Sequence, residues 1–437
     1  MFEGNAYSRY LETVYYANVT ERRQIGLSGI FYINKDFVWE VLRVNKKGPE
    51  VLIVGGGIVG TSTAYYLSRK GVKVMLVEAG DVAGGTSGAC DRAIMIQSKN
   101  PGPLLNMALA SAGLYEGLED QLGESLEYNK KGGMIVIEQE EEMNVMEHIV
   151  ERQRASGIAV KLCSREETMA MQPAVSSHII GATWWDGDAD VNPMTVCLAM
   201  ARAARAKGAE IVLNTRVCSL LMEKSKVVGV STAAGDIRAD RVLLAAGVWT
   251  PELGKTAGLK IPIIPRKGQL LVSERIAPLI IGNVLSGSYI ACKHNPGLAE
   301  RAGRNEKKLG LGLSLGQTKN GNLLIGGTRE FAGYERSTSS EAIKAIAGNA
   351  VRLFPALKTV RIIRSFAGLR PYTPDGLPLL GQVEGRPGLY MAAGHEGDGV
   401  ALGPVTGNIM AGVIAGDPVD WDLSPFNPDR FEDFYTS

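Results

Sequence analysis

Cysteine is scarce in this chain. Its 437 residues include only five cysteines, and no two of them form a CxxC pair: Cys90, Cys163, Cys197, Cys218 and Cys292. A zinc site or a four-cysteine iron–sulfur cluster held by this chain alone is therefore not expected, and we predict no bound metal. The odd, sparse count also favours a reducing cytoplasm over a disulfide-stabilised fold.

Two further absences narrow the class of protein. No uncharged apolar run reaches the ~18–20 residues that a membrane-spanning helix requires, and the first residues lack the basic start and apolar core of a secretory signal. We therefore expect a cytoplasmic protein without a transmembrane segment. Lys and Arg (47) balance Asp and Glu (46), leaving a net charge of +1, so a general nucleic-acid-binding surface is not expected.

Length and glycine content are the features present in excess. A single core rarely grows beyond about 250–300 residues, so 437 residues favour at least two lobes. Glycine accounts for 53 residues, above its typical share of about 7%. Because there is no collagen-like period, this excess indicates tight turns and close backbone approaches.

A strand–helix–strand unit is predicted near residue 50. The apolar run VLIV (51–54) is typical of a buried parallel strand, and it leads directly into GGGIVG (55–60). A helical pattern follows over 61–71, and a second apolar strand over 72–80. In such a unit the crossover is nearly always right-handed.

The turn of this unit has the spacing of a dinucleotide-binding motif. Gly55, Gly57 and Gly60 form GxGxxG, which permits a tight turn, approach of a pyrophosphate and close helix–strand packing. Glu78 ends the second strand, where a carboxylate accepts hydrogen bonds from ribose hydroxyls. An acid here disfavours the 2′-phosphate of NADP but leaves both NAD and FAD open.

Three more segments bear on the cofactor. GGTSG (84–88) could wrap a phosphate or a flavin edge, although an ordinary turn has the same composition. RVLLAAGVWTPEL (241–253) suits packing against an adenosine, although a packed parallel strand has the same sequence pattern. GHEGDG (394–399) is a second glycine-rich loop before a predicted helix. A nicotinamide enzyme needs no second loop, whereas a long bipartite ligand does. The second loop therefore favours FAD.

Together with neighbouring passages, these motifs resemble a known family. Between about residues 51 and 416, the chain is similar to the FAD-dependent D-amino-acid-oxidase-like family, which includes glycine oxidase and the sarcosine oxidases. It most resembles the beta-type catalytic subunits of heteromeric proline, D-hydroxyproline and opine dehydrogenases and of hydrogen cyanide synthase. The passages that carry the resemblance are VLIVGGGIVGTSTAYYL, GGTSGACD, PRKGQLLV, TKNGNLLIGGTREF, AGLRPYTPDGLPLLG and AAGHEGDGVALGPVTG.

The resemblance implies an α/β fold, with a doubly wound, Rossmann-like FAD-binding domain interleaved with a mixed-sheet α+β substrate domain. We expect the FAD-binding domain at 50–100, 180–262 and 366–420, and the substrate domain at 101–179 and 263–365. Residues 1–49 lie outside the resemblance and are expected to be an N-terminal extension of unknown role. Residues 421–437 are expected to be a C-terminal tail.

Three catalytic candidates follow from the resemblance. Arg370 in AGLRPYTPDG matches the arginine that binds the substrate carboxylate in glycine-oxidase-like enzymes; a surface or structural ion pair is the alternative. His395 occupies a position beside the flavin in this family, with a structural histidine as the alternative. Tyr334 is expected to line the substrate pocket, although a packed aromatic would give the same sequence.

FAD is expected to bind noncovalently, because no cysteine follows LRPYTPDG. The expected contacts come from the glycine-rich turns and the adjoining strand ends: Gly55, Gly57, Ile58, Val59, Gly60, Glu78, Ala79, Thr86, Ser87, Val217, Ala246, Gly247, Gly394, Glu396, Gly397, Asp398, Gly399 and Val400.

Two departures from the family pattern affect the expected reaction. Glycine oxidase has an arginine where this chain has Gly397, so a second carboxylate contact is missing or supplied elsewhere. Monomeric sarcosine oxidases have a lysine that promotes reaction with oxygen, whereas the similar stretch here reads LLIG (323–326). The second departure favours a dehydrogenase over an oxidase.

We therefore expect oxidation of a carboxylated secondary amine or imino or amino acid (proline-, hydroxyproline-, sarcosine- or opine-like) by hydride transfer from Cα to flavin N5. Electrons would pass to a partner subunit with an iron–sulfur cluster or a second flavin. A stand-alone, peroxide-producing glycine or sarcosine oxidase and a non-catalytic FAD-bearing assembly subunit remain alternatives. An NAD-dependent dehydrogenase is the weakest alternative.

Overall fold

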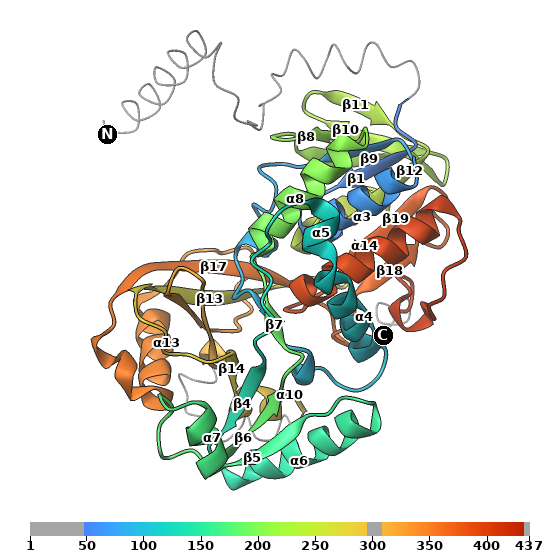
Figure 1. Cartoon of the computed structure of the whole chain (residues 1–437). Helices are drawn as coiled ribbons and strands as arrows, with labels where there is room; N and C mark the ends of the chain where they lie inside the picture. The colour runs from blue at the N-terminus through green and yellow to red at the C-terminus, as the bar shows by residue number, and fades with distance from the viewer. Residues whose placement is uncertain (1–47, 295–307, 432–437) are drawn as a thin grey trace, which may run out of the picture.

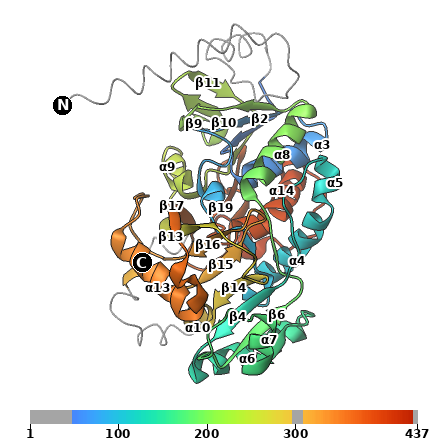
Figure 2. The ribbon, with the colours of Figure 1, turned by 60° about the vertical axis from the view of Figure 1, so that its left-hand side comes forward.

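The computed structural model describes residues 48–294 and 308–431. Within them the chain forms two lobes, each built around a large β-sheet, and Figures 1 and 2 show the lobes side by side. The predicted α/β class is confirmed. Residues 1–47 of the predicted N-terminal extension lie outside the described residues.

The first lobe contains a mainly parallel sheet of six strands. In spatial order these are β18 (Leu379–Gln382), β19 (Leu389–Ala393), β12 (Arg241–Leu244), β1 (Val51–Val54), β2 (Val74–Val77) and β8 (Glu210–Val212). β1 pairs in parallel with both β2 and β12, and only β18 runs antiparallel to its neighbour. The predicted strand–helix–strand unit at 51–80 forms the centre of this sheet.

Both faces of this sheet are covered, which explains why its strands are apolar throughout. Ile53 and Leu243 face α3 (Ile58–Arg69), α4 (Pro103–Glu116), α8 (Pro193–Ala206) and α14 (Gly399–Ala415). Leu52 and Leu244 face the opposite way, toward α9 (Thr250–Lys255) and a three-stranded sheet of β9 (Val217–Glu223), β10 (Lys226–Thr232) and β11 (Gly235–Arg238).

The second lobe contains a mixed sheet of eight strands. Its order is β17 (Ile362–Tyr372), β13 (Ile264–Arg275), β16 (Asn322–Gly326), β15 (Ser314–Gln317), β14 (Asn283–Ser286), β4 (Gly133–Ile137), β6 (Gly181–Trp185) and β5 (Lys161–Ser164). A two-stranded ribbon of β3 (Ala93–Ile94) and β7 (Ala189–Asp190) adjoins it.

Helices cover both faces of this second sheet. Ile135 and Ile137 pack with α6 (Glu140–Ala155) and α10 (Gly287–His294), whereas Met134 and Val136 pack in the cluster that includes α13 (Ser340–Leu353). Shorter helical segments complete the fold: η1 (Thr86–Gly88), η2 (Ile96–Ser98), α5 (Leu118–Leu122), α7 (Arg165–Met171), η3 (Gly247–Trp249), η4 (Pro355–Thr359) and η5 (Ser424–Phe426).

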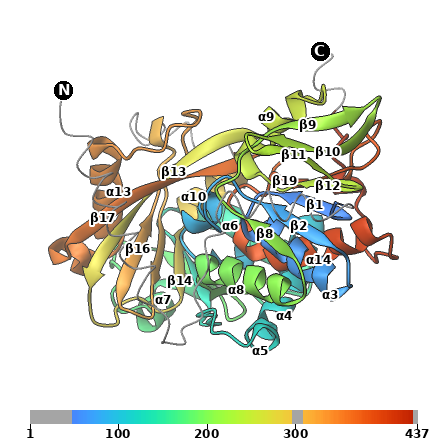
Figure 3. The same ribbon diagram turned by 90° about the horizontal axis from the view of Figure 1, so that it is seen from above.

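The long antiparallel pair β13–β17 extends from the second lobe toward the first, as the view from above shows (Figure 3). The predicted domain boundary at 365/366 falls inside β17, and β6 belongs to the eight-stranded sheet although it follows the predicted boundary at 179/180. Residue pattern alone does not reveal these offsets, because an apolar strand has the same sequence pattern in either sheet.

Two helices from opposite ends of the chain pack closely and in parallel. A Cβ on Gly403 would lie 2.7 Å from Ile58 Cγ1, and a Cβ on Gly407 would lie 2.4 Å from Ser62 Cβ. Positions four residues apart on α14 thus meet positions four residues apart on α3, in the same direction. The amino ends of both helices consequently lie at the same side of the sheet.

Among the described residues, no helix is long and apolar enough to cross a membrane. The same part of the chain contains no cluster of three or more His, Cys, Asp or Glu side chains suited to a metal ion.

The substitution Gly407→Ala tests the close helix contact. The added methyl would overlap Ser62 Cβ and lie 2.6 Å from its carbonyl carbon, so we expect a loss of about 1–3 kcal/mol in the free energy of unfolding. Gly348→Ala in α13 is the matched control, since no atom lies within 4 Å of the added Cβ; it should be neutral or stabilising. Equal denaturation midpoints for Gly407→Ala and wild type would contradict the account.

Candidate active site

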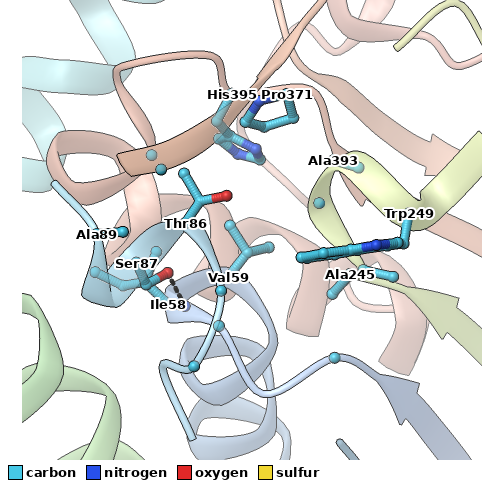
Figure 4. Close-up of a pocket in the computed structure, with 18 of the residues that line it drawn as sticks. Ile58, Val59, Thr86, Ser87, Ala89, Ala245, Trp249, Pro371, Ala393 and His395 are labelled. Carbon is cyan, nitrogen blue, oxygen red and sulfur yellow. Dashed lines mark hydrogen bonds between the residues drawn. The ribbon is translucent and has the colours of Figure 1, made fainter. Parts of the chain in front are cut away.

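A single cavity of about 560 Å³ lies between the lobes. It is lined by both glycine-rich loops, around Gly55–Gly57 and Gly394–Gly397, and by the amino ends of α3 and α14. Figure 4 shows Ile58 and Val59 on one side of this cavity and His395 with Pro371 on another. Two turns far apart in the sequence therefore share one binding space of ligand size.

Local hydrogen bonds shape the first turn. Gly60 packs on the strand end, where an added Cβ would lie 2.0 Å from the Gly55 carbonyl oxygen. Glu78 accepts hydrogen bonds from the backbone N–H of Gly56 (2.6 Å) and of Gly80 (2.8 Å). Ser87 Oγ accepts one from Ile58 N–H (3.0 Å), which links the 84–88 turn to the start of α3 (Figure 4).

Most of the predicted cofactor contacts line this cavity. They are Gly55, Gly57, Ile58, Val59, Glu78, Ala79, Thr86, Ser87, Val217, Ala246, Gly247, Gly394, Glu396, Gly397, Gly399 and Val400. Gly60 and Asp398 are not among the lining residues. Their roles as cofactor contacts remain predictions.

Asp398 instead forms a buried ion pair with Lys99. The Lys99 side chain is only 4% exposed, and its Nζ also donates to the Met95 carbonyl and to Ser98 Oγ, both at 3.0 Å. Met95 and Ser98 belong to the segment that joins the two lobes around η2. This ion pair anchors the start of α14, and hence the second glycine-rich loop, to that segment.

His395 lies in the cavity wall as a buried, neutral side chain. Its Nε2 is 3.0 Å from Thr406 Oγ1, and 4% of the residue is exposed. Burial lowers the pKa of this imidazole from 6.5 to about 4, only partly opposed by Asp398. Near neutral pH it is therefore a hydrogen-bonding side chain without a charge.

Tyr334 lies at the edge of the site. Its hydroxyl donates to the Val248 carbonyl (3.1 Å), its ring stacks on Trp249 at a centroid distance of 6.4 Å, and 44% of the residue is exposed. Trp249 lines the cavity, whereas Tyr334 is not among the lining residues. Its predicted contact with substrate therefore remains untested, and the structure places it one layer further out.

Arg370 reaches into the cavity across a neighbouring strand. Its guanidinium passes over Gly268 of β13, where an added Cβ would lie 2.2 Å from Nη1, and Nη1 donates to the Thr328 carbonyl at 3.0 Å. A side chain at position 268 would block this path. Arg370 thus presents its other N–H donors to the cavity that it lines.

A second arginine and a glutamate adjoin Arg370. Arg266 is its direct cross-strand partner, an arrangement of like charges that is unfavourable unless an anion lies nearby. Glu396 supplies that anion and forms an ion pair with Arg266. Although burial opposes ionisation, Arg329, Arg266 and Arg370 hold the pKa of Glu396 far below its ordinary value.

Several lining residues were not predicted from the sequence, among them Asp91, Trp249 and Tyr289. Asp91 is the last residue of the quoted GGTSGACD passage, and Trp249 lies within the 241–253 segment, so both had a local signal. Tyr289 had none, because it enters the site only through the packing of α10 on the second sheet.

His395→Gln tests the burial of the neutral imidazole. Below pH 6.5 the unfolded chain binds a proton that folded His395 does not bind until about pH 4, so this residue lowers stability as the pH falls through that window. Between pH 7 and 5 the wild type should lose roughly 2 kcal/mol more than the variant, as measured by denaturant unfolding. Exposed His148→Gln is the control and should follow the wild type. Parallel pH profiles for wild type and His395→Gln would disprove the assignment.

Comparison with known proteins agrees with this geometry. Residues 50–413 match the family described as DAO, FAD dependent oxidoreductase. Hydrogen cyanide synthase subunit HcnC of Pseudomonas protegens is 31% identical, over 88% of this chain and 97% of the relative. Glycine oxidase of Geobacillus kaustophilus is 29% identical, over 87% and 97% of the two chains.

Solved structures give the same result. The crystal structure of that glycine oxidase superposes with a TM-score of 0.79 at 28% identity, covering 87% of this chain and 98% of the other. L-proline dehydrogenase from P. horikoshii also gives 0.79, at 27% identity, with 89% and 99% coverage. The predicted family, enzyme class and FAD cofactor are confirmed: the chain belongs to the DAO family of FAD-dependent oxidoreductases.

Proposed function

We propose that this chain oxidises a carboxylated secondary amine or imino or amino acid of the proline, hydroxyproline, sarcosine or opine type, as the catalytic subunit of a heteromeric dehydrogenase. The observation that carries the proposal is the position of Arg370, which lines the same cavity as both glycine-rich loops. A carboxylate-binding side chain therefore faces the space assigned to the cofactor.

The lining residues fit a long, bipartite ligand such as FAD. The amino ends of α3 and α14 bring their positive dipole ends to one cavity. Glu78 at the end of β2 suits a ribose. Burial raises the pKa of the cavity-lining Cys90 thiol to about 12, which disfavours a thiolate there and supports noncovalent binding.

The residues of this chain would orient the substrate and exclude water. A guanidinium fork holds a carboxylate bidentately, so Arg370 would fix the substrate Cα relative to the second glycine-rich loop. When bound, FAD would accept a hydride (two electrons and one proton) from the substrate Cα, whose C–N bond becomes C=N. No side-chain base is required, because the amine can react in its unprotonated form. His395 is neutral and forms its hydrogen bond with Thr406.

The similarity to a synthase subunit supports a heteromeric assembly, because HcnC is described as one subunit of hydrogen cyanide synthase. The electrons would then leave through a partner subunit that carries an iron–sulfur cluster or a second flavin. A stand-alone oxidase is the second candidate, since the glycine oxidases align over nearly their full length. Rapid peroxide formation by the isolated chain in air would favour the oxidase.

Arg370→Ala tests the carboxylate clamp. We expect anaerobic flavin reduction to slow about a hundredfold or more with D- or L-proline, hydroxyproline, sarcosine, glycine or opines. The reason is that truncating one partner of a charge-assisted pair of this kind costs about 2–5 kcal/mol. Reduction by carboxylate-free pyrrolidine should remain as slow as in wild type. The measurement is the bleaching of the flavin absorbance in a stopped-flow instrument.

Arg364→Ala is the matched control, because Arg364 lies on the same strand but is exposed; its rates should equal those of wild type. If Arg370→Ala is reduced as readily as wild type by every carboxylated substrate, the clamp is refuted. If no amine in the panel reduces the wild-type flavin, the proposed reaction itself fails, and a non-catalytic FAD-bearing assembly subunit is favoured.

A further inference from the structure

Three arginines project from one face of the second sheet. Arg266 and Arg370 are cross-strand partners on β13 and β17, so their side chains share a face. The backbones of Lys267 and Glu330 form an isolated antiparallel β-bridge, so Glu330 shares the face of Lys267, which is the other face of the sheet. Its neighbour Arg329 therefore lies on the face of Arg266 and Arg370. These three guanidinium groups come from segments far apart in the sequence.

Arg329 differs from the other two in lacking a polar partner. Arg266 pairs with Glu396, and Arg370 donates to the Thr328 carbonyl. Within residues 48–294 and 308–431, the Arg329 guanidinium forms no hydrogen bond or ion pair, and its buried Nε is unsatisfied. Its Cζ lies 3.4 Å from the centroid of the Tyr289 ring, and Tyr289 lines the cavity.

Stacking on Tyr289 leaves the N–H donors of Arg329 free, because they lie in the plane of the guanidinium, whereas the ring covers its face. Burial, the largest cause, lowers the pKa of Arg329 to about 9, while Glu396 partly offsets this. Arg329 is nevertheless only partly buried. A desolvated cation with free donors next to a cavity is a site for an anion.

The pairing of charges on this face also indicates an anion-binding site. Arg266 is paired with Glu396, whereas Arg329 and Arg370 have no carboxylate partner among the described residues. Lys99 and Asp398 neutralise each other. Two guanidinium groups without a carboxylate partner suit a ligand that carries two carboxylates.

We propose that the substrate is a secondary amine with two carboxylates, one bound by Arg370 and the other by Arg329 at the edge of the Tyr289 ring. The proposal rests on the proposed function and narrows its four substrate types to the opine type. It also accounts for the glycine at position 397, where glycine oxidase has an arginine. In this chain Arg329 would supply the second arginine, from the sheet rather than from the loop.

Two other roles for Arg329 make different predictions. If Arg329 and Arg370 bound the same carboxylate, removing Arg329 would weaken the binding of monocarboxylates as much as that of dicarboxylates. If Arg329 served only to compensate negative charge on the reduced flavin, its removal would change the flavin midpoint potential but not the binding of either ligand. Ligand binding to the oxidised holoenzyme therefore separates the three roles.

Binding of unreactive sulfur analogues tests the proposal. Thiodiacetate carries two carboxylates, whereas (methylthio)acetate carries one, and neither contains an oxidisable amine. Dissociation constants are measured by flavin difference spectra and by calorimetry. We expect wild type to bind thiodiacetate about ten- to a hundredfold more tightly, and Arg329→Met to lose that preference while binding (methylthio)acetate within about twofold of wild type.

Two further variants keep the test decisive. Arg329→Lys retains the charge without the planar fork and should keep part of the preference, which also covers the case in which Arg329→Met does not fold. Arg364→Met removes an exposed arginine of β17 that is not among the residues lining the cavity and should leave the preference unchanged.

The proposal is overturned if wild type binds the two analogues equally, if Arg329→Met weakens the binding of both alike, or if Arg364→Met rather than Arg329→Met abolishes the preference. These results are independent of turnover. Failure of every amine to reduce the flavin would refute the proposed reaction while leaving this binding test valid.

Discussion

The close parallel contact between α3 and α14 is the constraint on which the rest of the site depends. Without side chains at Gly403 and Gly407, these helices approach until Ile58 and Ser62 lie against them. The first helix follows the GxGxxG turn, and the last follows the second glycine-rich loop. Their contact brings two amino ends, from opposite ends of the chain, to one cavity, where their dipoles favour negative charge.

The second lobe supplies the other wall, and its charge is organised by strand pairing. Gly268 lets the Arg370 side chain cross β13, and the pairing of β13 with β17 sets Arg266 beside it. Glu396, which lies in the second glycine-rich loop, forms an ion pair with Arg266 and so offsets the repulsion between the two arginines. One carboxylate thus couples the loop of the first lobe to the arginines of the second.

Sequence and structure agree where the determinants are local. The glycines at 55–60, Glu78 and the 394–399 loop each lie beside a strand or a helix that can be identified from neighbouring residues, and residues of all three line one cavity. The pairing of Lys99 with Asp398 and the clustering of Arg266 with Arg329 depend instead on long-range strand and loop contacts. No local pattern encodes these contacts, and for the same reason the predicted boundary at 365/366 divides β17.

The central claim is that two distant glycine-rich turns hold opposite ends of a single FAD. The most direct test is equilibrium titration of flavin-free protein with FAD, ADP and riboflavin phosphate, followed by flavin fluorescence quenching and calorimetry. Because FAD joins both fragments, the account predicts that it binds far more tightly than either one, and that each fragment competes with it. If FAD bound no more tightly than ADP, only one turn would hold the cofactor, and the account would be contradicted.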